Sequence, residues 1–139
     1  MSGEVTWREL TSQPGAWAPL LARLESGALA LPEGLAGADD YLLLGSGSSY
    51  YLALAIADWM RRRGHDARAV PSCEVLLDPW ETRPSARRRV AIGISRSGFS
   101  TELILASRRL SAAGFTTCGI TCTAGSDLLK EADLGLLIP

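Results

Sequence analysis

The residues best suited to chemistry lie in one short polar loop, Ser95–Ser100, which has three hydroxyls, a glycine and no carboxylate. The apolar run Val90–Ile94 precedes this loop, and a helical pattern of residues follows it. A loop of this composition that opens onto the positive end of a helix dipole is suited to bind an anion. The sequence therefore predicts a small-anion site here, and a phosphate is the anion that fits it best.

Two further loops, Gly45–Ser49 and Thr121–Ser126, are also rich in Ser, Thr or Gly and also follow apolar runs. In an open α/β sheet, ligands bind beyond the carboxyl ends of the strands, where helix N-termini converge. Helix capping could explain a single serine such as Ser100 or Ser126. Capping does not explain three hydroxyl-rich loops at one edge, and we therefore expect the loops to form one site.

Nucleotide-binding alternatives fit these loops poorly. The segment Gly45–Tyr50 reads G-x-G-x-x-Y, so it lacks the third glycine of the dinucleotide fingerprint. Val70 and Pro71 stand where a ribose-binding acid is expected. The Lys-Ser/Thr ending of a P-loop is missing as well. We expect neither NAD nor ATP, and no other cofactor.

A repeated order of strand, polar loop and helix must position these loops. The apolar runs predict strands over 41–44, 67–70, 90–94, 116–120 and 134–138, and helical spacing predicts helices over 50–63, 74–77 and 101–113 and from Ser126. Near-continuous apolar strands separated by helices indicate a parallel sheet that is covered on both faces. The predicted fold class is therefore α/β, with an open, doubly wound, five-stranded parallel sheet flanked by helices.

The first 40 residues follow a different pattern, which predicts an N-terminal helical arm over 1–40 and a sheet domain over 41–139. The spacing of Thr6 and Glu9 suggests a capping box, and 17–31 has an apolar helical pattern interrupted by Pro19 and Gly27. The arm is too short for a second domain, and 139 residues with 47% hydrophobic content fit a single folded domain.

Composition argues against several other classes of protein. A net charge of −1 offers no general attraction for nucleic acid. We interpret the basic run 61–63 as cations at a helix C-terminus and the run 87–89 as solvated. The apolar stretches are too short to span a membrane, and the N-terminus does not resemble a signal peptide, so the cytoplasm is the expected compartment. Cys73, Cys118 and Cys122 predict neither a disulfide framework nor a metal site.

The three loops resemble the ligand loops of SIS (sugar isomerase) domains, and the most specific element is the Ser-x-Ser-Gly-x-Ser pattern of Ser95–Ser100. Within that family, Arg96–Gly98 followed by Ser100 and Glu102 is similar to the tagatose-6-phosphate ketose/aldose isomerase branch, which is related to galactosamine-6-phosphate deaminases. Phe99 departs from the Asn or Glu common there. The resemblance implies a SIS-type, flavodoxin-like sandwich that binds a sugar 6-phosphate.

The resemblance also implies roles for residues of the three loops. The phosphate would be held by the hydroxyls of Ser95, Ser97 and Ser100 and by the N–H groups of Arg96 and Gly98. The sugar would be met by Gly47, Ser48, Ser49 and Thr123.

No catalytic residue can be named from the sequence. Enzymes with paired SIS domains take a glutamate, a histidine and a lysine mainly from the second half, and nothing here matches those positions. Glu74 and Glu102 are the candidate substitutes for the missing catalytic groups, but each has a structural explanation. Glu102 would be favoured by a helix dipole, and Glu74 could cap a short helix. We therefore expect the phosphosugar-binding half of an isomerase or deaminase that works as a homodimer or with a second SIS half. A complete isomerase with its site between subunits and a non-catalytic binding or sensor module are the alternatives.

Overall fold

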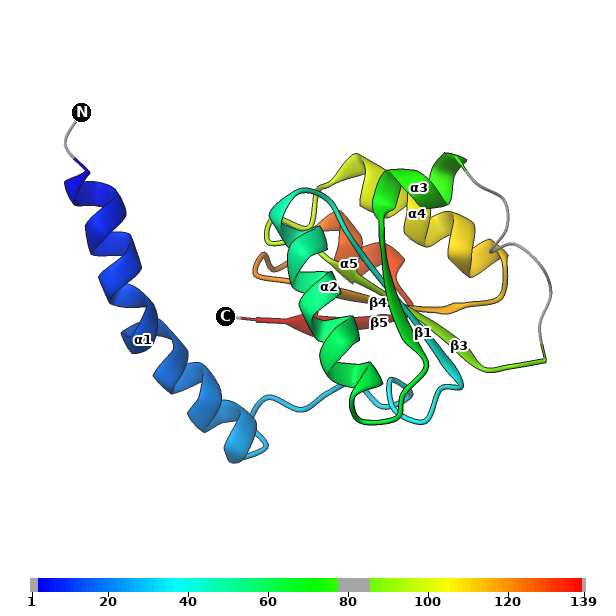
Figure 1. Cartoon of the computed structure of the whole chain (residues 1–139), viewed down its shortest axis with the longest axis horizontal. Helices are drawn as coiled ribbons and strands as arrows, with labels where there is room; N and C mark the ends of the chain where they lie inside the picture. Colours follow the sequence, from blue (N-terminus) through cyan, green and yellow to red (C-terminus); the bar gives the residue numbers. More distant parts are fainter. Residues whose placement is uncertain (1–2, 78–85, 139) are drawn as a thin grey trace. The chain divides into compact units, whose positions relative to one another are not determined.

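The computed structural model describes residues 3–77 and 86–138. Contacts divide the chain into two units, one that ends at Leu31 and one that comprises Pro32–Ile138. Figure 1 shows the helices and strands of both units.

The first unit is a single helix, α1 (Glu4–Glu25), which continues through both Pro14 and Pro19. It begins directly after Gly3, so Thr6 lies inside the first turn and the expected capping box at Thr6 is wrong. A proline removes one intrahelical hydrogen bond but does not forbid a helix outright. No residue of α1 is buried, and Trp7 is 69% exposed.

The second unit is a sheet of five parallel strands in the order β2-β1-β3-β4-β5. The strands are β1 (Asp40–Gly45), β2 (Ala67–Pro71), β3 (Arg89–Ile94), β4 (Thr116–Thr121) and β5 (Leu134–Leu137). The helices are α2 (Ser48–Arg61), α3 (Ser72–Leu77), α4 (Thr101–Ala112) and α5 (Asp127–Glu131). Figure 1 shows α2 on one side of the sheet and α3, α4 and α5 on the other. The predicted fold class is confirmed.

Alternation along the strands builds two separate cores. In β1, Leu42 and Leu44 face the core that contains α4, while Tyr41 and Leu43 face the core that contains α2. Successive side chains of a strand point to opposite faces, so a sheet covered on both faces needs apolar residues at every position. This requirement explains why the central strands are continuous apolar runs in the sequence.

The strand order places the loops of interest side by side. The chain leaves β1 toward β2 on one side and later returns to β3 on the other, so the order of the sheet reverses between β1 and β3. The ends of these strands are level, since Leu44 pairs with Gly93 and Ile94 pairs with Ile120 of β4. Ligands of open α/β sheets bind at such a reversal, beyond the carboxyl ends of the strands.

Residues just after Leu31 belong to the sheet unit by their contacts. Leu35 and Ala38 pack against the α2-side core. Arg88 donates to the carbonyl oxygen of Ala36 at 2.9 Å and also to that of Gly34. These contacts attach the segment that leads into β1 to the sheet unit.

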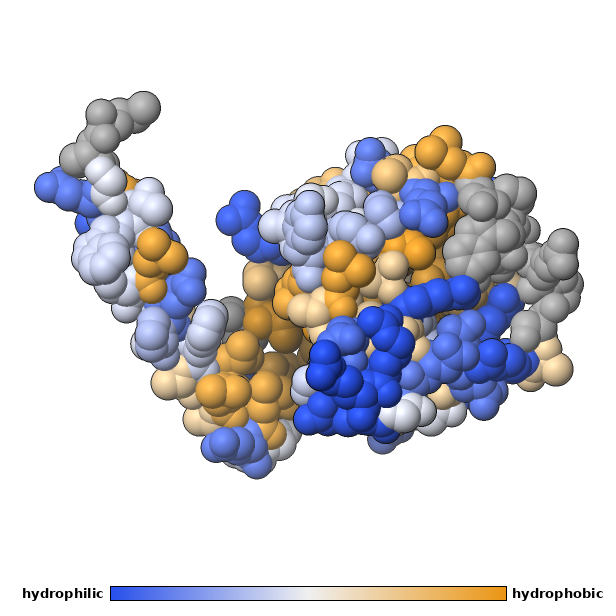
Figure 2. Space-filling model, in the orientation of Figure 1, coloured by the Kyte–Doolittle hydropathy of each residue, from blue (hydrophilic) through white to orange (hydrophobic). Residues whose placement is uncertain are grey.

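The two basic runs have different structural roles. At the C-terminal end of α2, Asp58 pairs with Arg61 and Arg62, and Arg63 stacks on Trp59, as expected for cations at a helix end. Figure 2 shows the strongly hydrophilic surface that results there.

Arg89 departs from the prediction for the second run, because it is buried rather than solvated. Its guanidinium lies over the ring of Phe115 and donates to the carbonyl oxygen of Ala113 at 2.6 Å.

Among the described residues, no helix is long and apolar enough to cross a membrane.

Candidate functional site

The first loop is shaped by two glycines. A Cβ at Gly45 would lie 2.5 Å from the carbonyl carbon of Ser49, so the backbone of α2 can approach the end of β1 only at a glycine. Gly47 precedes the helix with φ 57°, a left-handed conformation that favours glycine. The helix therefore begins at Ser48, earlier than the sequence suggested, and both Ser48 and Ser49 lie in its first turn.

The second loop folds back on itself through its own hydroxyls. The buried Ser95 accepts a hydrogen bond from the Gly98 N–H at 3.1 Å, and Ser97 accepts one from the Phe99 N–H at 3.3 Å. A hydroxyl that accepts a bond keeps its own hydrogen for another acceptor. Ser100 precedes α4, yet its side chain makes no capping hydrogen bond. These three serines thus lie in the loop that leads into α4, and each hydroxyl is able to donate.

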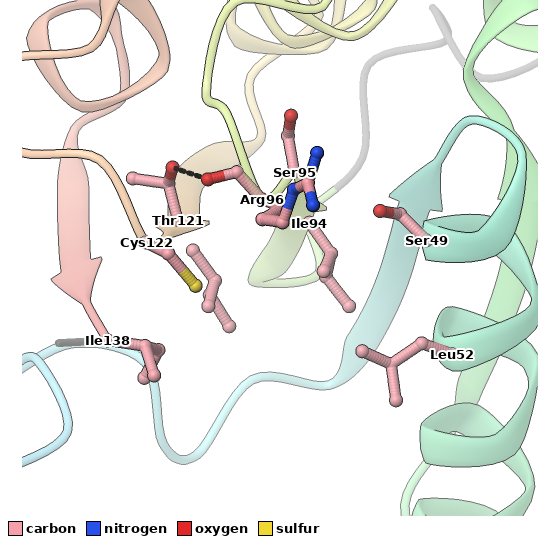
Figure 3. Close-up of a pocket in the computed structure, with 9 residues that line it drawn as sticks. Ser49, Leu52, Ile94, Ser95, Arg96, Thr121, Cys122 and Ile138 are labelled. Carbon is pink, nitrogen blue, oxygen red and sulfur yellow. Dashed lines mark hydrogen bonds between the residues drawn. The ribbon is translucent and has the colours of Figure 1, made fainter. Parts of the chain in front are cut away.

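The third loop holds the second one in place. The carbonyl oxygen of Arg96 accepts bonds from the Thr121 hydroxyl at 3.1 Å, the Cys122 N–H at 3.1 Å and the Thr123 hydroxyl at 3.3 Å. The Leu128 N–H donates to the carbonyl oxygen of Gly98 at 3.0 Å. Figure 3 shows the bond between Thr121 and Arg96. The two loops thus form one hydrogen-bonded unit at the ends of β3 and β4.

A cavity of about 230 Å³ lies between the N-terminal part of α2 and the ends of β3 and β4 (Figure 3). Of the predicted site residues, Ser49, Ser95 and Arg96 line it. Its walls also include apolar side chains, among them Leu52, Ile94, Ile120 and Ile138. The remaining predicted residues lie in the same loops but not in this lining, and they are Gly47, Ser48, Ser97, Gly98, Ser100 and Thr123.

Sequence reasoning missed the contributions of Thr121 and Cys122, which line the cavity beside Arg96. The sequence did offer a signal for Thr121, because this residue is the first of the hydroxyl-rich loop Thr121–Ser126. The hydroxyl of Thr123, which we expected against a sugar, instead supports the carbonyl of Arg96. Its proposed contact with a ligand stays a prediction.

One cation and one carboxylate stand out near the loops. Arg96 is exposed, and Glu102 lies exposed in the first turn of α4, where its Oε2 accepts a bond from the Ser46 hydroxyl at 3.2 Å. Sequence reasoning placed Glu102 in the isomerase-branch motif and favoured a structural role for it on the helix dipole, and it missed the bond to Ser46. Within residues 3–77 and 86–138, no group of three or more His, Cys, Asp or Glu side chains could hold a metal ion.

Comparison with known proteins identifies the family. The profile of the SIS domain family matches residues 34–139, which include all three loops and all five strands. The chain belongs to the SIS domain family. The expectation drawn from the loop motifs is therefore confirmed, and the open sheet described above is that of a SIS domain.

Three proteins similar to this SIS domain, two of them solved structures, are considerably longer than the chain. A glucosamine-6-phosphate deaminase from Thermotoga maritima is 32% identical with a TM-score of 0.70, over 90% of this chain and 36% of that one. A tagatose-6-phosphate ketose/aldose isomerase from Escherichia coli is 26% identical with a TM-score of 0.79, over 95% and 39%. The glutamine–fructose-6-phosphate aminotransferase [isomerizing] 2 of Mus musculus is 32% identical over 97 residues, which are 70% of this chain and 14% of that protein. The SIS domain thus corresponds to a minor part of the length of each of these three proteins.

Proposed function

We propose that this chain is the phosphosugar-binding SIS domain of a sugar-phosphate isomerase or an aminosugar-phosphate deaminase, and that its ligand is a tagatose-type or amino-sugar 6-phosphate. The observation that carries the proposal is the joined pair of loops at the N-terminus of α4. There the carbonyl of Arg96 is bound from the third loop, while Ser95, Ser97 and Ser100 present hydroxyls.

The chemistry of these groups suits a phosphate dianion. Hydrogen bonds to an ionised acceptor are shorter and about twice as strong as neutral ones. The N-terminus of the 12-residue helix α4 adds a favourable dipole. Because the loop is already held by the third loop, little conformational entropy is lost when the ligand binds. In this proposal the Arg96 N–H and the Gly98 N–H complete the phosphate site, the latter by exchanging its bond to Ser95.

The sugar would lie toward the first loop. Gly47, Ser48 and Ser49 stand at the end of β1, which is the neighbour of β3 in the sheet. Thr123 would contact the ligand from the third loop, beyond β4. A sugar whose phosphate binds at α4 can reach both sides of the strand reversal, where ligands of such sheets bind.

The names of the relatives favour the same ligand class. A glucosamine-6-phosphate deaminase, a tagatose-6-phosphate isomerase and a fructose-6-phosphate aminotransferase share a hexose 6-phosphate in their names and differ in the sugar. We assign no catalytic residue to this chain, and we propose that a second SIS half or a second subunit supplies the acid and base groups. A non-catalytic binding or sensor module is the alternative.

The test is calorimetry of the purified chain with tagatose 6-phosphate, glucosamine 6-phosphate and the corresponding unphosphorylated sugars. Binding of the phosphorylated ligands alone is the expected result. Equal affinity for the free sugars, or no binding of any phosphorylated ligand, would contradict the proposal. An isomerase or deaminase rate from the same preparation would show that copies of this chain form a complete active site, against our expectation of a binding half.

A further inference from the structure

The bond between Ser46 and Glu102 crosses the point where the strand order reverses. Ser46 follows β1, and Glu102 lies in the first turn of α4, which follows β3. The two residues are 56 positions apart, and the Ser46 hydroxyl donates to Oε2 of Glu102 at 3.2 Å. The carboxylate of Glu102 is therefore turned from the phosphate loop toward the loop that we propose for the sugar.

Both ends of this bond are held by backbone constraints. Ser46 stands between Gly45, where a Cβ would meet the backbone of Ser49 at 2.5 Å, and Gly47, whose φ is 57°. Glu102 is carried by a helix of 12 residues. The fold thus sets the backbone positions of both residues, and the bond from Ser46 orients the carboxylate.

A carboxylate at this place is unfavourable for a phosphate and favourable for an ammonium group. Like charges at the same helix end repel one another, so Glu102 lowers the affinity for every phosphorylated ligand. A ligand that carries both a phosphate and an ammonium group regains this loss through attraction to the carboxylate. The charge of Glu102 therefore distinguishes amino-sugar phosphates from neutral sugar phosphates by their binding affinity.

We propose that Glu102, oriented by Ser46, is a specificity-determining residue that favours amino-sugar 6-phosphates over neutral sugar 6-phosphates. This inference rests on the function proposed above and narrows its substrate class. Exposed ion pairs contribute up to about 1 kcal/mol, which corresponds to a preference of about 5-fold. Salt screens such pairs, so the preference decreases as ionic strength rises.

The test compares glucosamine 6-phosphate with glucose 6-phosphate, two ligands that differ in an ammonium and a hydroxyl group. In calorimetry at low salt, the unsubstituted chain should prefer the amino sugar by about 5-fold. Glu102→Gln should abolish this preference, while its affinity for glucose 6-phosphate stays constant or rises. Ser46→Ala, which leaves the carboxylate in place but unoriented, should reduce the preference only partly. Thermal unfolding checks that both variants are folded.

Glu131→Gln is the control, because Glu131 lies away from the three loops. Glu131 ends α5 and pairs with Arg108. Two residues later, Asp133 bonds Thr117 near the start of β4, whereas the loops follow the ends of the strands. This variant should keep the full preference. Three results would overturn the role of Glu102. They are an unchanged ratio of the two affinities in Glu102→Gln, an equal loss of affinity for both ligands in that variant, and no preference in the unsubstituted chain. Failure of both ligands to bind the unsubstituted chain would instead overturn the proposed function itself.

Discussion

Gly98 and Ser126 are in such close contact that only a glycine fits at the first position. A Cβ at Gly98 would lie 2.3 Å from the Ser126 hydroxyl oxygen and 2.4 Å from its Cβ. Ser126 is completely buried, and within the described residues its hydroxyl has no hydrogen-bond partner. The turn of the loop Ser95–Ser100 is therefore packed directly against the start of α5.

Gly98→Ala should destabilise the protein and distort the proposed phosphate site. The left-handed φ of 70° alone costs about 1 kcal/mol for alanine, and the steric overlap adds about 2 kcal/mol more. Urea unfolding should therefore show a loss of about 3 kcal/mol in the free energy of unfolding.

Gly125→Ala is a matched control, since Gly125 has φ 69° but no atom within 4 Å of the position that a Cβ would occupy. It should lose only about 1 kcal/mol. Ser126→Gly introduced into Gly98→Ala should restore part of the stability, because it removes both Ser126 atoms and leaves only the closer-than-normal contact with Thr121 Oγ1 at 2.9 Å. Equal losses in the two alanine variants would contradict the packing argument.

Ser97→Ala should weaken phosphosugar binding without unfolding the loop. The exposed Ser97 hydroxyl accepts only the local bond from the Phe99 N–H, and its loss removes one donor to a charged ligand, at a cost of about 1–3 kcal/mol. Calorimetry measures the change. Ser111→Ala, an exposed serine near the other end of α4, should bind like the unsubstituted chain. Unchanged affinity in Ser97→Ala would remove Ser97 from the proposed phosphate site.

Stability should depend on pH through Glu131. The bidentate hydrogen bonds from Arg108, at 2.5 and 2.6 Å, lower the pKa of the Glu131 carboxyl below its ordinary value of 4.5. A lowered pKa in the folded state gives stability that is present above pH 4.5 and is lost as the pH falls through the folded-state pKa.

Melting temperatures measured from pH 6 down to about pH 3 test this effect. Glu131→Gln should melt lower at pH 6 and should show a shallower decline toward acid. Arg108→Gln should reproduce this shallower decline, since it removes the same pair from the other side. A decline in both variants as steep as in the unsubstituted chain would exclude the pair as its source.

The cysteines should react in two classes. Cys73 and Cys122 are exposed, whereas Cys118 is buried in the α2-side core, and burial raises the pKa of its thiol to about 11. A thiolate is the reactive form, so Cys118 is protected both sterically and chemically. Titration with a thiol reagent near pH 8 should therefore modify two of the three cysteines in the folded chain and the third only after denaturation. Reaction of all three at one rate would contradict the buried position of Cys118.

Thr117 of β4 and Asp133, the residue before β5, form a clamp in which each residue donates hydrogen bonds to the other. The Thr117 N–H and hydroxyl both donate to Oδ2 of Asp133 at 2.8 Å, and the Asp133 N–H donates to the Thr117 hydroxyl at 3.1 Å. Thr117→Val keeps the shape but loses two of these bonds, and should cost about 1–2 kcal/mol in the free energy of unfolding.

Chemical denaturation measures that cost, with Thr116→Val as the control. Thr116 is the neighbouring residue of β4, it is half-buried, and replacing it should change stability by less than about 0.5 kcal/mol. A similar loss in both variants would mean that the clamp contributes nothing beyond general packing.

Local patterns in the sequence were sufficient to predict the α/β class and the three polar loops. The apolar runs 41–44 and 90–94 indicated buried parallel strands, because only a sheet covered on both faces needs apolar residues at every position. Helix boundaries were less exact, as Ser48 and Ser49 show, since the close approach at Gly45 starts α2 earlier than its apolar spacing suggests.

Tertiary structure decided which residues meet. Periodicity is a property of neighbours in the chain, whereas the bond between Ser46 and Glu102 and the contact between Gly98 and Ser126 depend on the strand order β2-β1-β3-β4-β5. The burial of Arg89 over Phe115 depends on the same packing.

The loop Ser95–Ser100 illustrates this division most clearly. Its hydroxyl-rich composition between strand and helix was readable from Ser95–Ser100 alone, because anion binding needs only donors at a helix N-terminus. The support of that loop through the carbonyl of Arg96, and the placement of Glu102 beside the first loop, arise from strands that become neighbours only when the sheet forms.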